Sequence, residues 1–364
     1  MGQYCRMTPH DRMRAVLMTG IGGFEMLSVR DDVAVPVAHT GEVLIRVGAA
    51  GVNNTDINTR TGWYAKDVVE PTMPLATAVS ERADIGWGGN VPTFPRIQGA
   101  DACGTIVAVG PGVGEDRVGE RVVVEPVFRA PGAALESAIY FGSEVDGAFA
   151  EFARVPSMHA HRIDCRLSDE ALASFPCSYS AAENMIHRAE VRLDDVVLVT
   201  GASGGVGSAA VQLARRRGAE VIAIASSDKQ DAIRALGAVQ VLGRDDDLVA
   251  ALAGRRVDVV IDVVGGPQWP SLLDALRPGG RYAVAGAIAG PMVSLDLRTL
   301  YLKDLRLIGC TVLDQEVFPN LVGYIERGEI QPLVAATFPL SDIVAAQQLF
   351  LTKQHVGKIV LRCD

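Results

Sequence analysis

The sequence has few cysteines, and their spacing does not suit a bound metal. The six lie far apart and form no Cys-x-x-Cys pair, which argues against a structural zinc knuckle. Scattered thiols with apolar neighbours suit a reducing compartment better than a disulfide framework. We therefore expect small buried side chains at these positions, which are Cys5, Cys103, Cys165, Cys177, Cys310 and Cys363.

Long apolar runs and blocks of basic residues are also missing. No stretch of about 18 apolar residues occurs, so we expect no transmembrane helix. Residues 1–12 lack the apolar segment of a secretory signal and are interpreted as a tail, which favours a cytoplasmic protein. The net charge is -9, and the longest basic run is Arg215 to Arg217. This balance argues against nucleic acid or an anionic membrane as a partner.

The first part of the chain has the pattern of a β-rich domain. From residue 13 to about 166, short apolar runs are bounded by glycine and proline, which is typical of a small barrel or sandwich. Two segments rich in glycine and proline, 65–96 and 126–147, interrupt the pattern. We predict that both are long loops, and loops of this length are usually functional or mobile.

From residue 167 the pattern changes to alternating strands and helices. Ser168 is a predicted helix N-cap, because two acidic residues follow it in the first turn. Continuous apolar runs such as 196–200 and 257–261 are separated by helical segments. Apolar strands divided by helices predict a parallel sheet covered on both faces, and therefore an α/β fold.

A glycine cluster follows the first apolar strand of this region. Glycine permits a sharp turn after the strand, and it lets the backbone approach a pyrophosphate closely. The next helix has Val206, Ala210 and Leu213 on one face, and the free N–H groups at its start attract negative charge. The cluster therefore predicts a dinucleotide site formed by Gly201, Ser203, Gly204, Gly205, Val206 and Gly207.

The end of the next strand decides between the two nicotinamide dinucleotides. An NAD site places an acidic residue there to hold the ribose 2′-hydroxyl, but this chain has Ala225. Ser226, Ser227 and Lys229 can accommodate a 2′-phosphate instead. We therefore predict NADPH/NADP+ as the cofactor. NAD stays an alternative, because Asp228 lies close by in the sequence.

Three segments together resemble the medium-chain dehydrogenase/reductase superfamily. They are Gly51–Asn58 with Gly62–Tyr64, Gly99–Gly104 with Val109–Gly110, and the glycine cluster with Gly357–Lys358. The resemblance is to the zinc-free branch of quinone oxidoreductases and enoyl reductases.

This resemblance implies a fold, a division of the chain and an oligomeric state. It implies a GroES-like β-rich catalytic domain over 13–166, a Rossmann doubly wound domain over 167–312, and a return to the catalytic domain over 313–364. It adds Gly286 and Lys358 to the cofactor contacts. Members are commonly dimers or tetramers, so a homodimer or homotetramer is expected by analogy.

The residues that hold catalytic zinc in relatives are mostly replaced here. Matched one by one, the ligands fall on Asn53, Ala100 and Cys177, and the glutamate beside the second becomes Asp101. One thiol cannot hold zinc in a catalytic site, so we expect no metal. The alternative is a zinc-type alcohol dehydrogenase with an atypical ligand set of Asp101, Cys177 and either His159 or His161.

Zinc-free members of the family transfer hydride to a quinone, an enone or an enoyl thioester. The resemblance makes Tyr64 the hydrogen-bond donor to the substrate carbonyl or enolate. Asn53 and Thr55 then shape the pocket beside the nicotinamide, and Asp56 orients its neighbours. We further hypothesise that the loops at 65–96 and 126–147 wall the substrate pocket, with Trp63 and Trp87 adding apolar surface. A non-catalytic NADPH-binding protein is a further alternative.

Overall fold

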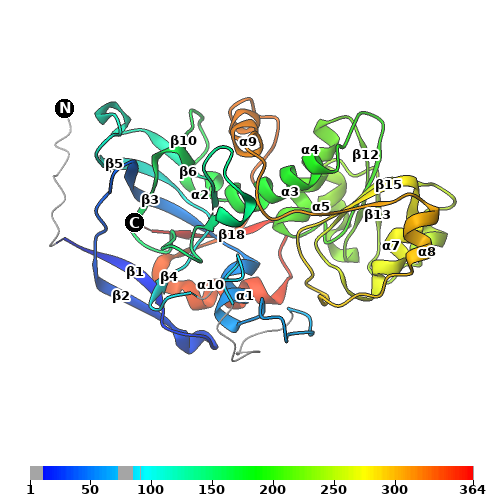
Figure 1. Cartoon of the computed structure of the whole chain (residues 1–364), viewed down its shortest axis with the longest axis horizontal. Coiled ribbons are helices and arrows are strands. Elements are labelled where there is room, and N and C mark those ends of the chain that lie inside the picture. Colours follow the sequence, from blue (N-terminus) through cyan, green and yellow to red (C-terminus); the bar gives the residue numbers. More distant parts are fainter. Residues whose placement is uncertain (1–10, 73–84, 91, 364) are drawn as a thin grey trace.

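The computed structural model describes residues 11–72, 85–90 and 92–363, so most of the expected N-terminal tail lies outside it. Two lobes lie side by side along the long axis of the molecule (Figure 1). Antiparallel strands build most of one lobe, and a parallel sheet builds the other. The predicted α/β class, with a β-rich domain and a doubly wound parallel-sheet domain, is confirmed.

The β-rich lobe contains a seven-stranded and a three-stranded sheet. The larger sheet has the order β10-β6-β5-β3-β18-β17, with β9 also paired to β3, and the smaller has the order β2-β1-β4. Apolar residues from both sheets share one buried core. The strands are β1 (Arg12–Met18), β2 (Leu27–Ala34), β3 (Glu42–Val52), β4 (Arg96–Ile97), β5 (Cys103–Val109), β6 (Arg121–Val124), β9 (Phe152–Pro156), β10 (Ala160–Arg162), β17 (Val334–Pro339) and β18 (Lys358–Arg362).

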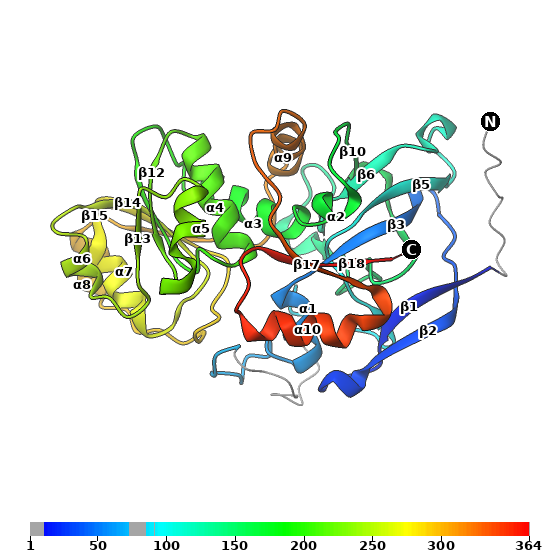
Figure 2. The same ribbon diagram turned by 180° about the vertical axis from the view of Figure 1, so that it is seen from behind.

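The end of the chain returns to the sheet where the chain began. β18 pairs antiparallel with β3, so that Ile359 lies opposite Val52. Figure 2 shows the last helix, α10 (Ile343–Thr352), beside α1 (Asn54–Thr61), which follows β3. Lys358, the first residue of β18, is thereby brought next to the start of α1.

The second lobe is a six-stranded parallel sheet with the order β13-β12-β11-β14-β15-β16. From β11 the chain runs outward to β12 and β13 on one side, and then crosses back to β14 on the other side of β11. Ligands of open sheets of this kind bind outside the carboxyl ends of the strands where the order reverses, which here is the end of β11. The strands are β11 (Val196–Val199), β12 (Glu220–Ile224), β13 (Gln240–Leu242), β14 (Val257–Asp262), β15 (Leu276–Val284) and β16 (Arg306–Gly309).

Helices cover both faces of the parallel sheet. Val197 and Val199 of β11 share a core with α3 and α4, whereas Leu198 between them packs in the core that contains α7. The N-cap predicted at Ser168 is present, and its hydroxyl accepts a hydrogen bond from Ala171 N. The remaining α-helices are α2 (Asp169–Leu172), α3 (Pro176–Arg188), α4 (Gly205–Arg216), α5 (Gln230–Ala235), α6 (Leu248–Ala251), α7 (Trp269–Ala275), α8 (Leu297–Leu302) and α9 (Val317–Glu326).

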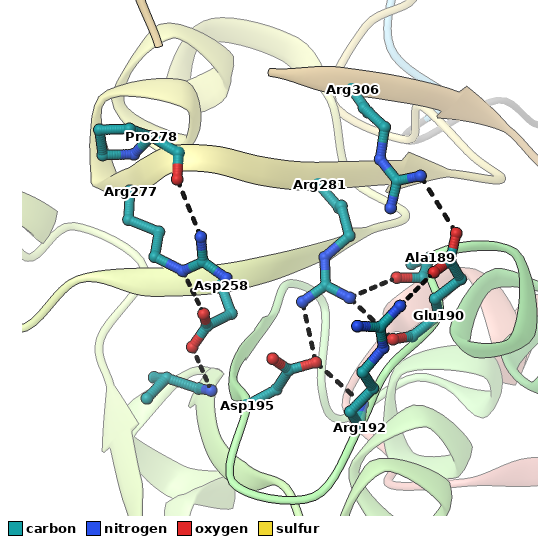
Figure 3. A network of polar contacts seen from close by, with 10 residues as sticks. Ala189, Glu190, Arg192, Asp195, Asp258, Arg277, Pro278, Arg281 and Arg306 are labelled. Carbon is teal, nitrogen blue, oxygen red and sulfur yellow. Dashed lines mark hydrogen bonds and ion pairs between the residues drawn. The ribbon is translucent and has the colours of Figure 1, made fainter. Parts of the chain in front are cut away.

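A buried polar network fixes the end of α3 to the parallel sheet (Figure 3). The Arg281 guanidinium on β15 donates to the carbonyl oxygens of Ala189 and Glu190 at 2.9 and 2.7 Å, and to the Asp195 carboxylate at 2.9 Å. The guanidinium is itself buried, so breaking these contacts would leave a buried charge without partners. α9 also packs on α3. This helix therefore contacts the second lobe, although it lies in the segment 313–364 that was predicted to return to the catalytic domain.

The segment 126–147 contains more regular structure than the predicted long loop. It holds a two-stranded ribbon, β7 (Val127–Phe128) with β8 (Ile139–Tyr140), and the 3-10 helix η3 (Leu135–Ser137). Two backbone amides of the segment 85–90 bind this region: Trp87 N donates to Ser143 Oγ, and Gly88 N to Glu144 Oε1. Of the other predicted loop, residues 73–84 and 91 lie outside the described structure.

None of the helices in the described residues combines the length and apolar character needed to cross a membrane.

Candidate functional site

The glycine cluster forms the turn between β11 and α4. Gly201 has a φ of 56°, in the left-handed region that favours glycine. α4 begins at Gly205, and its N-cap, Gly204, has no side chain to accept a hydrogen bond from the first turn. The start of a helix left without a side-chain cap is suited to bind an anion.

Two of these glycines allow close packing that any other residue would block. A Cβ atom on Gly205 would lie 2.5 Å from Ser178 Oγ and 3.0 Å from Lys358 Cδ. A Cβ on Gly207 would collide with the backbone of Gly201 and Ala202. Gly204, in contrast, would meet only Gly201 O, at 3.5 Å. Gly205 therefore keeps the turn in contact with Lys358, and Gly207 holds the helix against the turn.

The predicted cofactor residues of the turn lie together. Ser203 is buried, and its carbonyl oxygen accepts a hydrogen bond from Gly357 N at 3.2 Å. This contact lays the segment before β18 on the glycine turn. Val206 is half-buried at the start of α4. Gly286 lies elsewhere, on the wall of a cavity formed beyond the ends of β15 and β16.

The residues predicted to select the cofactor lie after β12, in and next to the 3-10 helix η5 (Ser227–Lys229). Ala225 is buried. A hydrogen bond with Ser226, together with the nearby charges of Lys229 and Arg244, lowers the pKa of Asp228. Asp228 is therefore held among cations, and Arg244 is a basic neighbour that the sequence reasoning missed.

A cavity of about 290 Å³ opens beside this segment, at the carboxyl ends of β12 and β13. Its lining is partly apolar and includes Ile224, Leu242 and Leu248. Its polar lining includes Asp246, Asp247 and Gln268. Apolar surface beside a few polar groups is typical of a small-molecule site.

The predicted catalytic segment begins with a well-formed helix start. Asn53 caps α1, and its own backbone N–H donates to the Asp56 carboxylate at 2.7 Å, which completes a capping box. Burial is the largest influence on Asp56 and raises the pKa of its carboxyl group to about 7. Asp56 thus caps the start of α1.

A buried network joins Asn53 to two residues far away in the sequence. Lys358 Nζ donates to Asn53 Oδ1 at 2.5 Å and to Asp101 Oδ2 at 2.7 Å. Asn53 Nδ2 donates to the same Asp101 oxygen at 2.8 Å, and Cys177 N donates to the other at 2.5 Å. Asp101 and Lys358 are almost completely buried. The sequence singled out Lys358 as a cofactor contact, but it gave no sign of this ion pair.

The side chains that meet here are an amide, a carboxylate, an ammonium and a thiol. Burial raises the pKa of the Cys177 thiol far above its usual value, and the nearby Asp101 charge raises it further. Zinc binds a thiolate and not a thiol. Ala100, in the histidine position of zinc enzymes, offers no ligand atom.

Tyr64 lies just beyond α1, after the left-handed Gly62. Burial is the largest influence on Tyr64 and raises its pKa to about 12, although the polar groups of Thr55 and Asn58 act in the opposite direction. Its ring packs against Trp63 at 5.6 Å between centroids. At neutral pH the phenol is therefore protonated and can donate a hydrogen bond.

A second cavity, of about 480 Å³, lies between the two lobes. Trp63 and Leu135 line it from the β-rich lobe, and Gly286, Cys310 and Val312 line it from the parallel-sheet lobe. Leu135 belongs to the segment 126–147, so one of the two predicted wall segments does contribute. Trp87, proposed as a second apolar wall, packs instead on Tyr140 at 4.9 Å between ring centroids.

Two histidines form a separate polar cluster. Glu125 Oε2 is linked to His159 Nδ1 at 2.8 Å and to His161 Nε2 at 3.2 Å. The three side chains offer ligand atoms within 4.8 Å of one another, a spacing that could also hold a metal ion. Within the described residues, the histidines meet Glu125 and are not grouped with Asp101 and Cys177. The atypical zinc ligand set considered from the sequence is therefore not assembled.

Two family models match the chain, one in each lobe. The alcohol dehydrogenase GroES-like domain matches residues 39–164, and the zinc-binding dehydrogenase model matches residues 205–327.

Curated proteins and solved structures are similar to nearly the whole chain. The acryloyl-coenzyme A reductase of Metallosphaera sedula is 30% identical, with 96% of this chain and 99% of that protein covered. The quinone oxidoreductase of Rattus norvegicus is 28% identical, with 96% and 97% covered. The crystal structure of a protein from Sinorhizobium meliloti that is named as an alcohol dehydrogenase has a TM-score of 0.89. The two sequences are 45% identical, and the match covers 100% of this chain and 99% of that chain.

Proposed function

Because the chain belongs to the medium-chain dehydrogenase/reductase superfamily, in its quinone oxidoreductase and enoyl reductase-like branch, we propose that it is an NADPH-dependent reductase that works without zinc. Its acceptor is a quinone, an enone or an enoyl thioester. The observation that carries the proposal is the buried Lys358–Asp101–Asn53 network. It occupies the place of the metal ligands and touches the glycine turn at Gly205.

Several features of the site support a bound dinucleotide phosphate. The start of α4 is without a side-chain cap, and a cavity with apolar walls lies beside the end of β12. NADPH is favoured over NADH because Ala225 replaces an acidic residue and Lys229 and Arg244 lie nearby. The Asp228 carboxylate is engaged with Ser226, so it is less available to a ribose hydroxyl.

The residues present do not fit a catalytic zinc ion. A catalytic zinc site needs three protein ligands, and Cys177 is the only residue retained from the set found in zinc enzymes. The charge of the Lys358 ammonium acts on Cys177, and this positive charge would repel a divalent cation bound to the thiol. The same ammonium supplies positive charge where zinc enzymes have a metal.

Bound NADPH supplies the hydride, and the residues of the chain position the acceptor and provide hydrogen bonds. We assign Tyr64 as the donor to the substrate carbonyl or enolate oxygen, since its raised pKa keeps the phenol protonated. Thr55 and Asn58 hold the hydroxyl group, and Asn53 shapes the pocket with Lys358. Trp63 and Leu135 provide apolar surface for the acceptor.

Relatives of this chain commonly form oligomers, and we infer a homodimer built on β16, with a homotetramer as the alternative. β16 is an edge strand of its sheet, and edge strands offer unpaired backbone groups to another chain. Large apolar side chains are exposed on it and on the adjacent α8: Leu297, Tyr301, Leu302 and Leu307. A two-fold axis would place the same patch of both copies in contact.

The function is tested by following NADPH oxidation with quinones, enones and enoyl thioesters, alongside metal analysis. Turnover that EDTA does not affect, in protein without bound metal, is the expected result. Stoichiometric zinc with turnover of alcohols would contradict the proposal and favour a zinc alcohol dehydrogenase. NADPH binding without turnover on the whole panel would favour a non-catalytic protein.

Tyr64→Phe tests the role of the phenol separately. We expect kcat to fall roughly 100-fold or more, since one positioned donor or acid contributes on this scale, while NADPH affinity is unchanged. Tyr140→Phe is the matched control, because that tyrosine packs on Trp87 and has no role in the proposed mechanism. Wild-type kcat in Tyr64→Phe would rule out the donor role.

A further inference from the structure

Lys353 is placed unusually for a lysine. It ends α10 with a φ of 51°, a left-handed conformation, and its ammonium group lies 3.4 Å from the centroid of the Phe350 ring. The ammonium also donates to Asn54 Oδ1 at 3.0 Å. Both contacts are with neutral groups, so neither compensates the positive charge. The contact with Asn54 places the ammonium at the start of α1.

The segment that follows Lys353 lies on the glycine turn. Gly357 N donates to Ser203 O, and the side chain of Lys358 reaches Gly205. From the other side, Lys229 Nζ donates to the carbonyl oxygen of Lys353. Three lysines from separate elements, η5, the end of α10 and β18, are therefore linked to the segment that lies on the glycine turn.

The carboxylates near this group are already engaged. Asp101 accepts from Lys358 at 2.7 Å, and Asp228 lies by Ser226 and Lys229. His355, on the same segment as Lys353, does not compensate the charge either: burial and the three lysines lower the pKa of its imidazole to about 4. The charged or titratable groups that face Lys353 are thus Lys229, Lys358 and the neutral His355.

Without a ligand, therefore, the positive charges of the lysines are not balanced by carboxylates that face Lys353. Burial, and then repulsion from Lys229 and Lys358, lowers the pKa of Lys353 to about 7. An anion placed among the three lysines would favour the charged form of each. A phosphate group on the glycine turn is such an anion.

We propose that Lys353 binds the diphosphate of the dinucleotide and takes up a proton when the dinucleotide binds. The inference rests on the proposed function, since it assumes a dinucleotide on the glycine turn. The diphosphate is favoured over the 2′-phosphate because Lys353 donates to Asn54. Asn54 follows Asn53, which accepts from Lys358, and the side chain of Lys358 reaches Gly205 of the glycine turn.

The experiment is isothermal titration calorimetry at pH 8 in two buffers with different ionisation enthalpies. At this pH a lysine with a pKa of about 7 is about nine-tenths neutral, while a cofactor 2′-phosphate is already ionised. The difference in apparent binding enthalpy gives the protons taken up. We expect close to one proton per site, with NADPH and with NADH alike.

Three variants separate charge from titration. Lys353→Met is expected to lose the proton uptake and to weaken NADPH binding roughly 10- to 100-fold, as for a lost charged hydrogen bond. Lys353→Arg keeps a permanent charge, so it should retain affinity and lose the uptake. Arg166→Met, at an exposed cation that lines neither cavity, should match the wild type. Thermal melts of each variant confirm folding.

Each outcome has a distinct meaning. NADPH binding without proton uptake, or uptake that persists in Lys353→Arg, would overturn the role of Lys353 and leave the proposed function standing. Uptake with NADPH but not with NADH would move Lys353 to the 2′-phosphate and overturn the diphosphate assignment. Failure of the wild type to bind either dinucleotide would overturn the proposed function as well.

Discussion

The buried Lys358–Asp101 pair gives the sharpest test of the site. Replacing Lys358 by methionine keeps much of the side-chain volume and removes the ammonium. Asp101, which is 0% exposed, would keep its hydrogen bonds from Asn53 and Cys177 N but would lose its counter-charge. Breaking one partner of a buried pair costs about 3–5 kcal/mol, because the remaining charge is left uncompensated.

This cost can be read as a shift in melting temperature. For a chain of this length that unfolds as one unit, an entropy of unfolding of about 2.1 cal/mol/K per residue converts the loss into a Tm decrease of about 4–7 °C. Differential scanning calorimetry of the full chain without cofactor is the assay. Lys66→Met, at an exposed position, should shift Tm by less than about 1 °C.

A double variant separates charge from packing. Asp101→Asn combined with Lys358→Met removes both charges, and the amide oxygen can still accept from Cys177 N. It is expected to be more stable than Lys358→Met alone, since no uncompensated charge remains. The reasoning is refuted if Lys358→Met melts like the wild type, or if the double variant loses the sum of the two single losses.

Two further predictions concern the glycine turn and the start of α1. Gly205→Ala should weaken NADPH binding at least tenfold by fluorescence titration, because the new methyl group would push against Ser178 and Lys358. Gly20→Ala is the control, because it lies outside the site and its methyl group would meet only the Met26 side chain, at 3.4 Å; equal affinities of the two variants would contradict this. Asp56→Asn should change the pH dependence of stability. The folded pKa of Asp56 is raised from 3.8 to about 7, so its ionisation destabilises the fold progressively as pH rises from about 4 to 7. The variant should show a flatter fall of Tm over that range, and an unchanged slope would reject the assignment.

Much of the fold could be predicted from the sequence, because its signals are local. The apolar run 196–200 and the glycines directly after it specify a strand, a turn and a helix start within about a dozen residues. β11 and α4 lie there, and Ala210 and Leu213 are buried as the period of the helix requires. Where the signal was weaker, as in 126–147, the short ribbon of β7 and β8 was missed, since two-residue strands leave no periodicity to detect.

The sequence by itself therefore determined the parallel sheet, the glycine turn between β11 and α4, and the absence of zinc-ligand residue types at positions 53 and 100. Only the tertiary structure decided which residues from distant parts of the chain lie beside that turn. The pairing of β18 with β3 brings Lys358 to Asn53 across 305 positions, and the end of α10 brings Lys353 to Asn54 across 299. Such contacts depend on the pairing of distant strands, which no local pattern encodes. The charge of each lysine depends on its burial and on its neighbours in space.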